Sequence, residues 1–233
     1  MTVDRTVNTI GEYVLIINFK NYIEVSANKT LELALAAERA ARLLNISTIL
    51  APPQASVGLV AQSVQIPVFC QHVDDAQVGQ STGFFVPELA KSFGASGSLL
   101  NHSEHRLDHK TIGSLVHRLR ELNMTSIVCA KTPTEAAELA KLGPSFIAFE
   151  PPELIGSGRA VSRESPKTIL DCANVVSQQS KSTRLICGAG IVDKSDVRSA
   201  LNLGATGILV ASGVVKANCW YETILDLGSG LLS

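Results

Sequence analysis

The 233-residue sequence predicts an α/β protein, a single (β/α)8 barrel, from three observations. Eight short apolar runs of strand length recur, and they are continuous rather than alternating, which indicates a parallel sheet buried on both faces. Amphipathic segments fill the gaps, without any linker or low-complexity stretch. The 45% of hydrophobic residues suffices for one large core. We therefore expect one domain over residues 1–233, with residues 1–12 as an N-terminal extension.

The eight predicted strands start about 20 to 40 residues apart. They are Tyr13–Ile17, Ser47–Leu50, Pro67–Cys70, Gly97–Leu100, Ser126–Cys129, Phe146–Phe149, Arg184–Cys187 and Gly207–Val210. An open doubly wound sheet is the alternative architecture. That fold normally carries a glycine fingerprint after its first strand, whereas here Asn18-Phe19-Lys20 follows, with no glycine. The barrel is therefore favoured.

Helix signals lie between the predicted strands. The spacing of Ile112, Leu115, Val116, Leu119 and Leu122 places apolar side chains on one face and predicts an amphipathic helix. The segment Thr132-Pro133-Thr134-Glu135 predicts a helix start with a complete capping box. Ser165-Pro166 and the segment from Asp193 to Asp196 predict the starts of two later helices.

Charge and cysteine content exclude several classes of protein. The formal net charge of -1 provides no general attraction to nucleic acid or to an anionic membrane, so an anionic substrate must be held locally. The apolar run Tyr13–Ile17 is too short for a membrane span or a signal peptide. Five scattered cysteines without a C-x-x-C spacing predict reduced, mostly buried thiols and no zinc site. We expect a cytoplasmic protein that binds neither nucleic acid nor membrane.

Polar side chains follow three predicted strands at their carboxyl ends, where a (β/α)8 barrel has its active site. Lys20 follows the first strand, His102 the fourth and Glu150 the sixth. Each has an ordinary explanation by itself: a lysine that reaches solvent, a hydrogen-bonded loop histidine, and a glutamate in a helix cap or salt bridge. Together they bring a cation, an imidazole and a carboxylate to one rim of the barrel.

Three glycine-containing loops indicate a phosphate site at the same rim. They are Gly156-Ser157-Gly158, Gly188-Ala189-Gly190 and Ala211-Ser212-Gly213, and the last two follow the seventh and eighth strands, where barrels commonly bind phosphate through backbone N–H groups. An ordinary turn is the alternative for any one of them. Prolines at one end and glycines at the other also suit the segment from Glu150 to Gly158 to a lid, while a static loop fits the same composition.

Five motifs occur in order at the predicted strand ends. They are Asn18-Phe19-Lys20, Asn101-His102-Ser103-Glu104, the segment from Glu150 to Gly158, Cys187-Gly188-Ala189-Gly190 and Ala211-Ser212-Gly213. Together, from about Tyr13 to Leu227, they resemble the triosephosphate isomerase family in its shorter archaeal form. The resemblance implies a TIM barrel that interconverts dihydroxyacetone phosphate and D-glyceraldehyde 3-phosphate through an enediolate, in glycolysis and gluconeogenesis, with no cofactor and no metal.

The resemblance also implies residue roles. Glu150 matches the general base, His102 the neutral electrophile, and Lys20 the ammonium that stabilises the enediolate and the bound dianion. Asn18 matches a substrate contact beside Lys20. The phosphate is expected at the backbone N–H groups of Ile155, Gly156, Gly190, Ala211 and Ser212.

Ser103 and Glu104 match positions behind the site, where we expect them to hold Glu150 and Lys20 in place. Because the segment from residue 73 to residue 85 is shorter than the interface loop of other members, and archaeal members resemble one another in being tetrameric, we predict a homotetramer, with a homodimer as the alternative. Two other functions remain open. Another phosphate-binding barrel enzyme, such as a sugar-phosphate epimerase, would share the phosphate loops alone, and a catalytically inactive barrel would lack the base or the electrophile.

Overall fold

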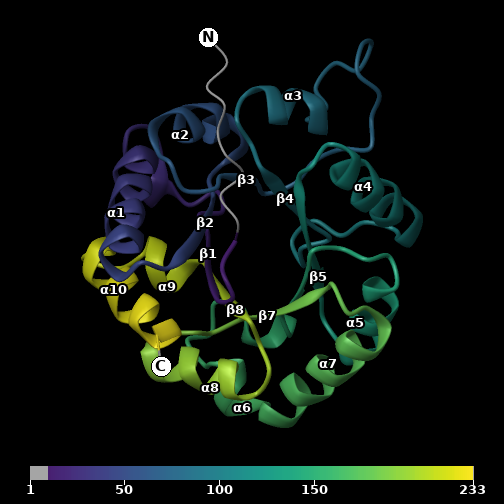
Figure 1. Cartoon of the computed structure of the whole chain (residues 1–233). Coiled ribbons are helices and arrows are strands. Elements are labelled where there is room, and N and C mark those ends of the chain that lie inside the picture. Colours follow the sequence, from purple (N-terminus) through teal and green to yellow (C-terminus); the bar gives the residue numbers. More distant parts are fainter. Residues whose placement is uncertain (1–9, 233) are drawn as a thin grey trace.

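The structure is a computed structural model that describes residues 10–232, so most of the predicted N-terminal extension lies outside the described residues. Parallel strands form a central ring and helices surround it (Figure 1). The strands are β1 (Val14–Asn18), β2 (Ser47–Ala51), β3 (Phe69–Cys70), β4 (Gly97–Leu100), β5 (Thr125–Ala130), β6 (Phe146–Phe149), β7 (Arg184–Gly188) and β8 (Gly207–Val210). Each strand overlaps one of the predicted apolar runs.

The sheet is closed. Its eight strands are hydrogen-bonded in the order β2-β1-β8-β7-β6-β5-β4-β3, all in parallel. The two ends of this order are joined because the Leu50 N–H donates to the Pro67 carbonyl oxygen at 3.0 Å, and Leu50 also forms a parallel bridge with Val68. The prediction of a (β/α)8 barrel is confirmed, and the open doubly wound sheet is excluded.

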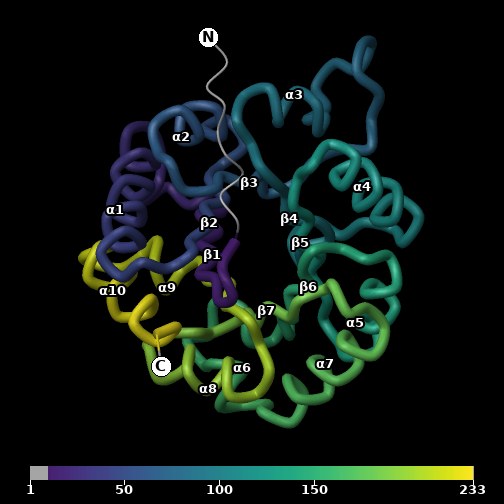
Figure 2. Tube along the Cα trace, viewed as in Figure 1, coloured from purple at the N-terminus to yellow at the C-terminus, as the bar shows by residue number. Residues whose placement is uncertain are grey.

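The helices of the described residues lie outside the strands. They are α1 (Lys29–Leu44), α2 (Val57–Ser63), α3 (Pro87–Ser92), α4 (His109–Glu121), α5 (Pro133–Ala140), α6 (Val161–Glu164), α7 (Pro166–Gln179), α8 (Lys194–Asn202), α9 (Ser212–Val215) and α10 (Trp220–Ser229). Short 3-10 turns lie at Ile23–Val25, Gln54–Ser56, Pro152–Leu154 and Gly230–Leu232. The first and last long helices, α1 and α10, pack side by side, so the two ends of the barrel sequence meet (Figure 2).

The helices begin at the positions that the sequence predicts, but not all of the predicted capping hydrogen bonds form. Asp193 forms a complete capping box with Asp196 at the start of α8. The Thr132 hydroxyl accepts a hydrogen bond from the Glu135 N–H at the start of α5. The Glu135 carboxylate does not complete the box, because it accepts from the Lys131 N–H and pairs with Arg106. The complete capping box predicted at Thr132 is therefore wrong. Ser165 precedes α7 without a side-chain cap.

Two apolar layers account for the continuous hydrophobic runs. In β1, Val14 and Ile16 point into the barrel, where they join large residues such as Phe69 and Phe146. Leu15 lies in the second layer, between strands and helices, and is fully buried. Successive side chains of a strand point to opposite faces, so a strand with core on both faces has no polar position.

The amino-terminal edge of the barrel is held by the last residues of the predicted extension. The Gly11 N–H donates to the Ser47 hydroxyl at 2.7 Å, and Arg184 donates to the carbonyl oxygens of Gly11 and Glu12. Ile10 packs against the barrel interior. These contacts lie at the end of the strands opposite to the predicted site.

The five cysteines are free thiols, four buried and one exposed, as the sequence predicts. Among the described residues, no helix has the length and hydrophobicity required to cross a bilayer.

Gly97 provides a test of the packing. A Cβ atom at this position in β4 would lie 2.5 Å from the Thr125 carbonyl oxygen and 2.6 Å from the Phe69 ring. We expect Gly97→Ala to lower the free energy of unfolding by about 1–3 kcal/mol, because neither neighbour can move without disturbing the sheet. Urea unfolding followed by circular dichroism measures the change.

The matched control is Gly113→Ala in α4, where the nearest atom, in Leu142, would lie 3.6 Å from the new Cβ. Alanine is a better helix former than glycine, so this variant is expected to gain about 0.5–1 kcal/mol. Equal unfolding midpoints for the two variants would contradict the packing argument.

Candidate active site

A pocket opens at the carboxyl ends of the strands. It is lined by Asn18, Lys20, Tyr22, His102, Glu150, Ile155, Gly156, Gly158, Ala189, Gly190, Ile191, Val192, Leu209, Val210, Ala211, Ser212 and Gly213. The structure thus brings together all predicted catalytic and substrate-binding residues, which come from five strand ends. Ser103 and Glu104, predicted to support the site, do not line the pocket.

Lys20 is fixed from several sides. The Asn18 side-chain oxygen accepts a hydrogen bond from the Lys20 N–H at 3.0 Å, which supports the unusual positive φ of 50° at Lys20. The Lys20 Nζ lies 2.7 Å from a Glu104 oxygen, and Gln71 donates to the Lys20 carbonyl oxygen at 3.0 Å. A cation therefore sits at the pocket wall with 9% of its surface exposed, already oriented.

The protonation of His102 follows from its hydrogen bond. The Glu104 N–H donates to His102 Nδ1 at 3.1 Å, so Nδ1 carries no proton. A neutral imidazole then has its proton on Nε2, and Nε2 is the atom that faces Glu150. The preceding residue, Asn101, adopts a φ of 58° and binds the Cys129 carbonyl oxygen and the Leu107 N–H through its side chain. This turn aims a hydrogen-bond donor into the pocket.

The Glu150 side chain packs against Gly188, a residue without a side chain. A Cβ atom on Gly188 would lie 2.7 Å from the Glu150 Cγ, so glycine leaves the space that the carboxylate occupies. Two thiols, Cys129 and Cys187, adjoin the carboxylate, and burial, more than the charge of Glu150, raises the pKa of both well above the usual value. Both thiols therefore stay neutral.

Two polar atoms of the pocket lack partners. His102 Nε2 and Glu150 Oε2 lie 3.6 Å apart, and neither has a hydrogen-bond partner within the described residues. Buried polar groups in native proteins are almost always satisfied, so two orphan atoms side by side indicate where substrate atoms bind. One atom is a donor and the other an acceptor, as acid–base chemistry on a carbonyl compound requires.

Free backbone N–H groups form the other half of the pocket. In the described chain, the N–H groups of Gly156, Gly190, Ser212 and Gly213 donate no hydrogen bond. Converging N–H groups of this kind bind anions, and Lys20 adds a positive charge nearby. Ile155 differs from the prediction, because its N–H already donates to the Pro152 carbonyl oxygen at 3.3 Å.

The predicted lid begins with a rigid turn and ends with two glycines. Pro152–Leu154 forms a 3-10 turn whose Leu154 side chain is buried. Gly156 and Gly158 have φ values of 69° and 70°, which other residues rarely adopt, and a Cβ atom on either would meet nothing within 4 Å. The segment over the pocket thus has a packed anchor and a loosely packed tip.

Comparison with known proteins identifies the family to which the chain is similar. The family model for triosephosphate isomerase matches residues 13–227. Curated triosephosphate isomerases that resemble the chain include those of Cenarchaeum symbiosum (49% identical, covering 94% of this chain and 97% of the relative), Caldivirga maquilingensis (43%, with 94% and 97% covered) and Methanothermobacter thermautotrophicus (39%, with 93% and 94% covered). The chain belongs to the triosephosphate isomerase family. It is accordingly an isomerase built on a TIM barrel.

Within this triosephosphate isomerase family member, the predicted supporting residues behave differently. Glu104 contacts Lys20 and presents its N–H to His102, as described above. None of the hydrogen bonds of residues 10–232 joins Ser103 to Glu150. The role of Ser103 in holding the base stays a prediction.

Sequence reasoning did not single out Tyr22 or the apolar residues Ile191, Val192 and Leu209 as pocket residues. Tyr22 follows Lys20 by two positions, and Lys216 lies over its ring at 4.6 Å. The position beside a predicted site residue was an available signal for Tyr22. The apolar residues gave none, because nothing distinguishes them in the sequence from core residues.

Gly188 provides a test of the placement of Glu150 in this isomerase. We expect Gly188→Ala to lower kcat about 100-fold, because the new Cβ displaces Glu150 and a shift of roughly 1 Å in a reacting group costs that much. Gly188 does not need the left-handed conformation that strains other residues. Initial rates of triose phosphate conversion measure the effect.

An unchanged urea midpoint together with wild-type kcat would show that Glu150 adapts to the added methyl group and would contradict the argument. Gly113→Ala, far from the pocket on α4, serves as the control and is expected to keep the wild-type kcat.

Proposed function

We propose that this protein interconverts dihydroxyacetone phosphate and D-glyceraldehyde 3-phosphate, with Glu150 as base, His102 as electrophile and Lys20 as the cation. The observation that carries the proposal is the pair of unpartnered atoms, Glu150 Oε2 and His102 Nε2, in one pocket with four free backbone N–H groups. A carbon acid, a carbonyl oxygen and a phosphate match these three features.

The proposed reaction needs two proton transfers at adjacent carbons. Glu150 removes a proton from the carbon next to the carbonyl of dihydroxyacetone phosphate, and the electron pair moves to the carbonyl oxygen. His102 stabilises this oxygen by donating from Nε2, and the Lys20 ammonium stabilises the developing negative charge. The protonated Glu150 then returns the proton to the former carbonyl carbon, and the hydroxyl proton moves between the two oxygens.

The lid and the free backbone N–H groups of the site protect the same enediolate intermediate. An enediolate next to a phosphate ester loses inorganic phosphate readily when the intermediate is exposed to water and its phosphate group can rotate freely. Free N–H groups at Gly156, Gly190 and Ser212 hold the phosphate, and closure of the lid excludes water. No feature of the site favours the alternative functions, an epimerase of sugar phosphates or an inactive barrel.

Additional observations support a cytoplasmic location and the archaeal form of the family. Five unpaired cysteines are consistent with a reducing cytoplasm. The archaeal form is supported by Phe19, Asn101 and Ala211-Ser212, which depart from the bacterial and eukaryotic pattern, and by the organisms of the similar proteins. The activity would serve glycolysis and gluconeogenesis.

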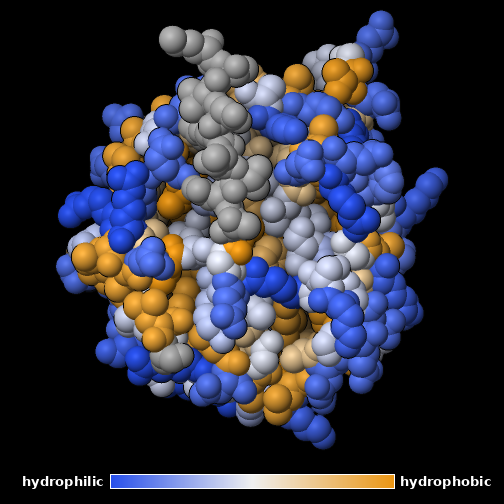
Figure 3. Space-filling model, viewed as in Figure 1, coloured by the Kyte–Doolittle hydropathy of each residue, from blue (hydrophilic) through white to orange (hydrophobic). Residues whose placement is uncertain are grey.

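We propose a homotetramer, with a homodimer as the alternative. Large apolar side chains are exposed on and around α3, namely Val78, Phe84, Leu89 and Phe93, each more than half exposed. Figure 3 shows hydrophobic surface at this edge of the molecule, next to the loop that projects from the barrel in Figure 1. Apolar side chains gathered in this way mark protein interfaces.

Glu150→Gln tests the chemistry. We expect kcat for D-glyceraldehyde 3-phosphate to fall roughly 100- to 10,000-fold, since an amide cannot accept the proton. The wild-type rate is expected to persist in the presence of a chelator, because the mechanism uses no metal. A coupled assay with purified protein measures both.

The control is Glu121→Gln, a carboxylate on the exposed face of α4, which should keep the wild-type kcat. Wild-type protein that binds inorganic phosphate but does not convert triose phosphates would refute the proposed activity and leave a phosphate-binding barrel of another kind.

The oligomer is tested by placing a charge on the apolar surface. Phe93→Glu is expected to reduce the mass of the assembly, because burial of a carboxylate in an apolar interface is unfavourable. Sedimentation equilibrium measures the mass, with Leu170→Glu on α7 as the control for a similar change elsewhere. A monomeric wild-type protein would refute the proposed assembly.

A further inference from the structure

Asp196 is a buried carboxylate that the proposed chemistry does not use. It lies in the first turn of α8 with 1% of its surface exposed. One oxygen, Oδ2, accepts hydrogen bonds from the N–H groups of Val192 at 3.0 Å and Asp193 at 3.4 Å. These two residues end the loop after β7, and Val192 lines the pocket. Asp196 therefore holds the end of the phosphate-binding loop from behind.

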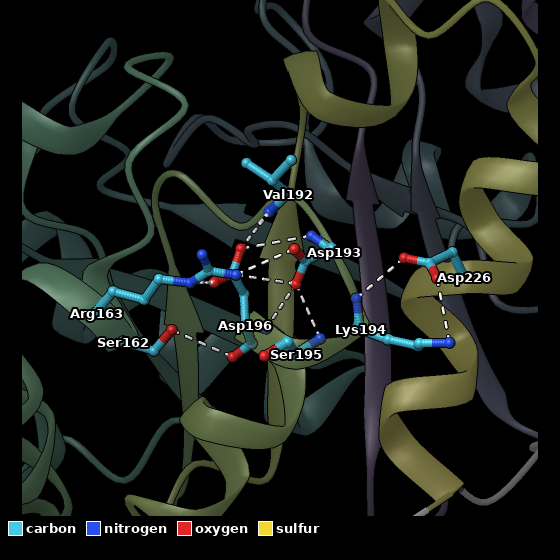
Figure 4. A network of polar contacts seen from close by, with 8 residues as sticks. All are labelled: Ser162, Arg163, Val192, Asp193, Lys194, Ser195, Asp196 and Asp226. Atoms are coloured by element: carbon cyan, nitrogen blue, oxygen red, sulfur yellow. Dashed lines mark hydrogen bonds and ion pairs between the residues drawn. The ribbon is translucent and has the colours of Figure 1, made fainter.

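The other oxygen of Asp196 faces a cation on a different segment. Arg163 Nε pairs with Asp196 Oδ1, and Arg163 Nη2 lies 3.2 and 3.0 Å from the two Asp193 oxygens (Figure 4). The neighbouring Ser162 hydroxyl donates to the Asp196 carbonyl oxygen at 3.2 Å. Arg163 and Ser162 belong to α6, the short helix that directly follows the lid.

The two segments also meet through their backbones next to the pocket. The Val161 N–H donates to the Ala189 carbonyl oxygen at 3.2 Å. The Arg159 carbonyl oxygen lies so close to Gly190 that a Cβ atom on Gly190 would be 1.8 Å from it. The end of the lid thus rests on the residue that offers a free N–H to the phosphate.

The pairing of Asp196 makes this arrangement depend on Arg163. Among residues 10–232, Arg163 Nε is the group that pairs with Asp196 Oδ1, so the guanidinium compensates the buried charge on that side. A buried carboxylate that loses its cation is strongly unfavourable and turns toward water. Such a movement would release the N–H groups of Val192 and Asp193, and with them the loop.

We infer that Arg163 and Asp196 are positioning residues that join the carboxyl-terminal end of the lid to the phosphate-binding loop as one unit. A phosphate bound at Gly190 then stabilises the closed lid, and a closed lid stabilises the bound phosphate. This inference rests on the proposed function.

The ion pair between Arg163 and Asp196 differs in its expected role from ion pairs that stabilise the fold alone. Arg118 provides the comparison, since it forms a bidentate pair with Glu88 at 2.8 and 2.7 Å between α3 and α4. The Arg118 side chain is 15% exposed, against 57% for Arg163. By burial and geometry alone, loss of Arg118 should therefore disturb the protein more.

The test compares Arg163→Gln with Arg118→Gln. For Arg163→Gln we expect kcat/KM to fall roughly two- to thirty-fold, the size of effects on coupling between sites, and the fraction of turnovers that release inorganic phosphate to rise by a similar factor. Arg118→Gln should lower the urea midpoint and leave both quantities unchanged. Arg163→Lys should restore part of the loss, since it keeps the charge on Asp196 but not the fork that reaches Asp193.

Hydrogen exchange gives a readout that does not depend on turnover. Saturating inorganic phosphate is expected to slow amide exchange in residues 154–160 of the wild type and of Arg118→Gln, but not of Arg163→Gln. Slowed exchange in Arg163→Gln equal to that of the wild type would overturn the inference, as would equal phosphate release by the two glutamine variants. Absence of isomerase activity in the wild type would instead refute the proposed function, and the exchange result would still decide whether the two segments are coupled.

Discussion

Closure of the eight-stranded parallel sheet is the constraint on which the rest of the structure depends. The closing contact is the hydrogen bond between the Leu50 N–H and the Pro67 carbonyl oxygen, next to the bridge between Leu50 and Val68. Because all strands are parallel, closure brings their carboxyl ends to one rim. Lys20 and Glu150 are 130 positions apart in the sequence and meet in one pocket for this reason. The same closure places α1 against α10.

Two of the buried side-chain atoms that lack hydrogen-bond partners within the described residues face the proposed substrate site, whereas a third, Thr48 Oγ1 in β2, lies away from it. His102 Nε2, Glu150 Oε2 and the four backbone N–H groups of the pocket lack partners within the described residues. Three residues near the rim, Lys20, Asn101 and Ala189, adopt positive φ values, which are unfavourable for residues other than glycine. Backbone strain at the rim is thus part of a wider set, since Asn45 and Asn123, which follow α1 and α4, also adopt positive φ values. The two apolar layers provide the stability that tolerates this strain.

Close backbone approaches decide the position of Glu150 and of the segment proposed as the lid. Gly188 leaves room for Glu150, and Gly190 leaves room for the Arg159 carbonyl oxygen. Gly188 ends β7 and Gly190 lies two residues further on, so one short stretch of chain limits the position of Glu150 and of the segment proposed as the lid. The network of Arg163 and Asp196 holds the far end of that loop. The geometry of the proposed site thus depends on residues that do not line the pocket.

The sequence by itself determined the strands, the barrel and the polar and glycine residues of the pocket, but not Tyr22 or the apolar residues that line it. The hydrophobic periodicity, the lengths of the apolar runs and the turn residues between them are local properties of the sequence. Because parallel strands of a barrel end at one rim, these local properties also predict which residues meet in the site. Tertiary structure decided what no local pattern contains. The Glu135 carboxylate accepts a hydrogen bond from the Lys131 N–H instead of completing the predicted capping box. Among the described residues, Ser103 makes no hydrogen bond to Glu150. The pairing of Arg163 with Asp196 joins residues 33 positions apart, in α6 and α8, two helices whose relative placement depends on the register of β6, β7 and β8. Contacts of this kind arise from packing of the closed barrel and have no signature in the order of residues.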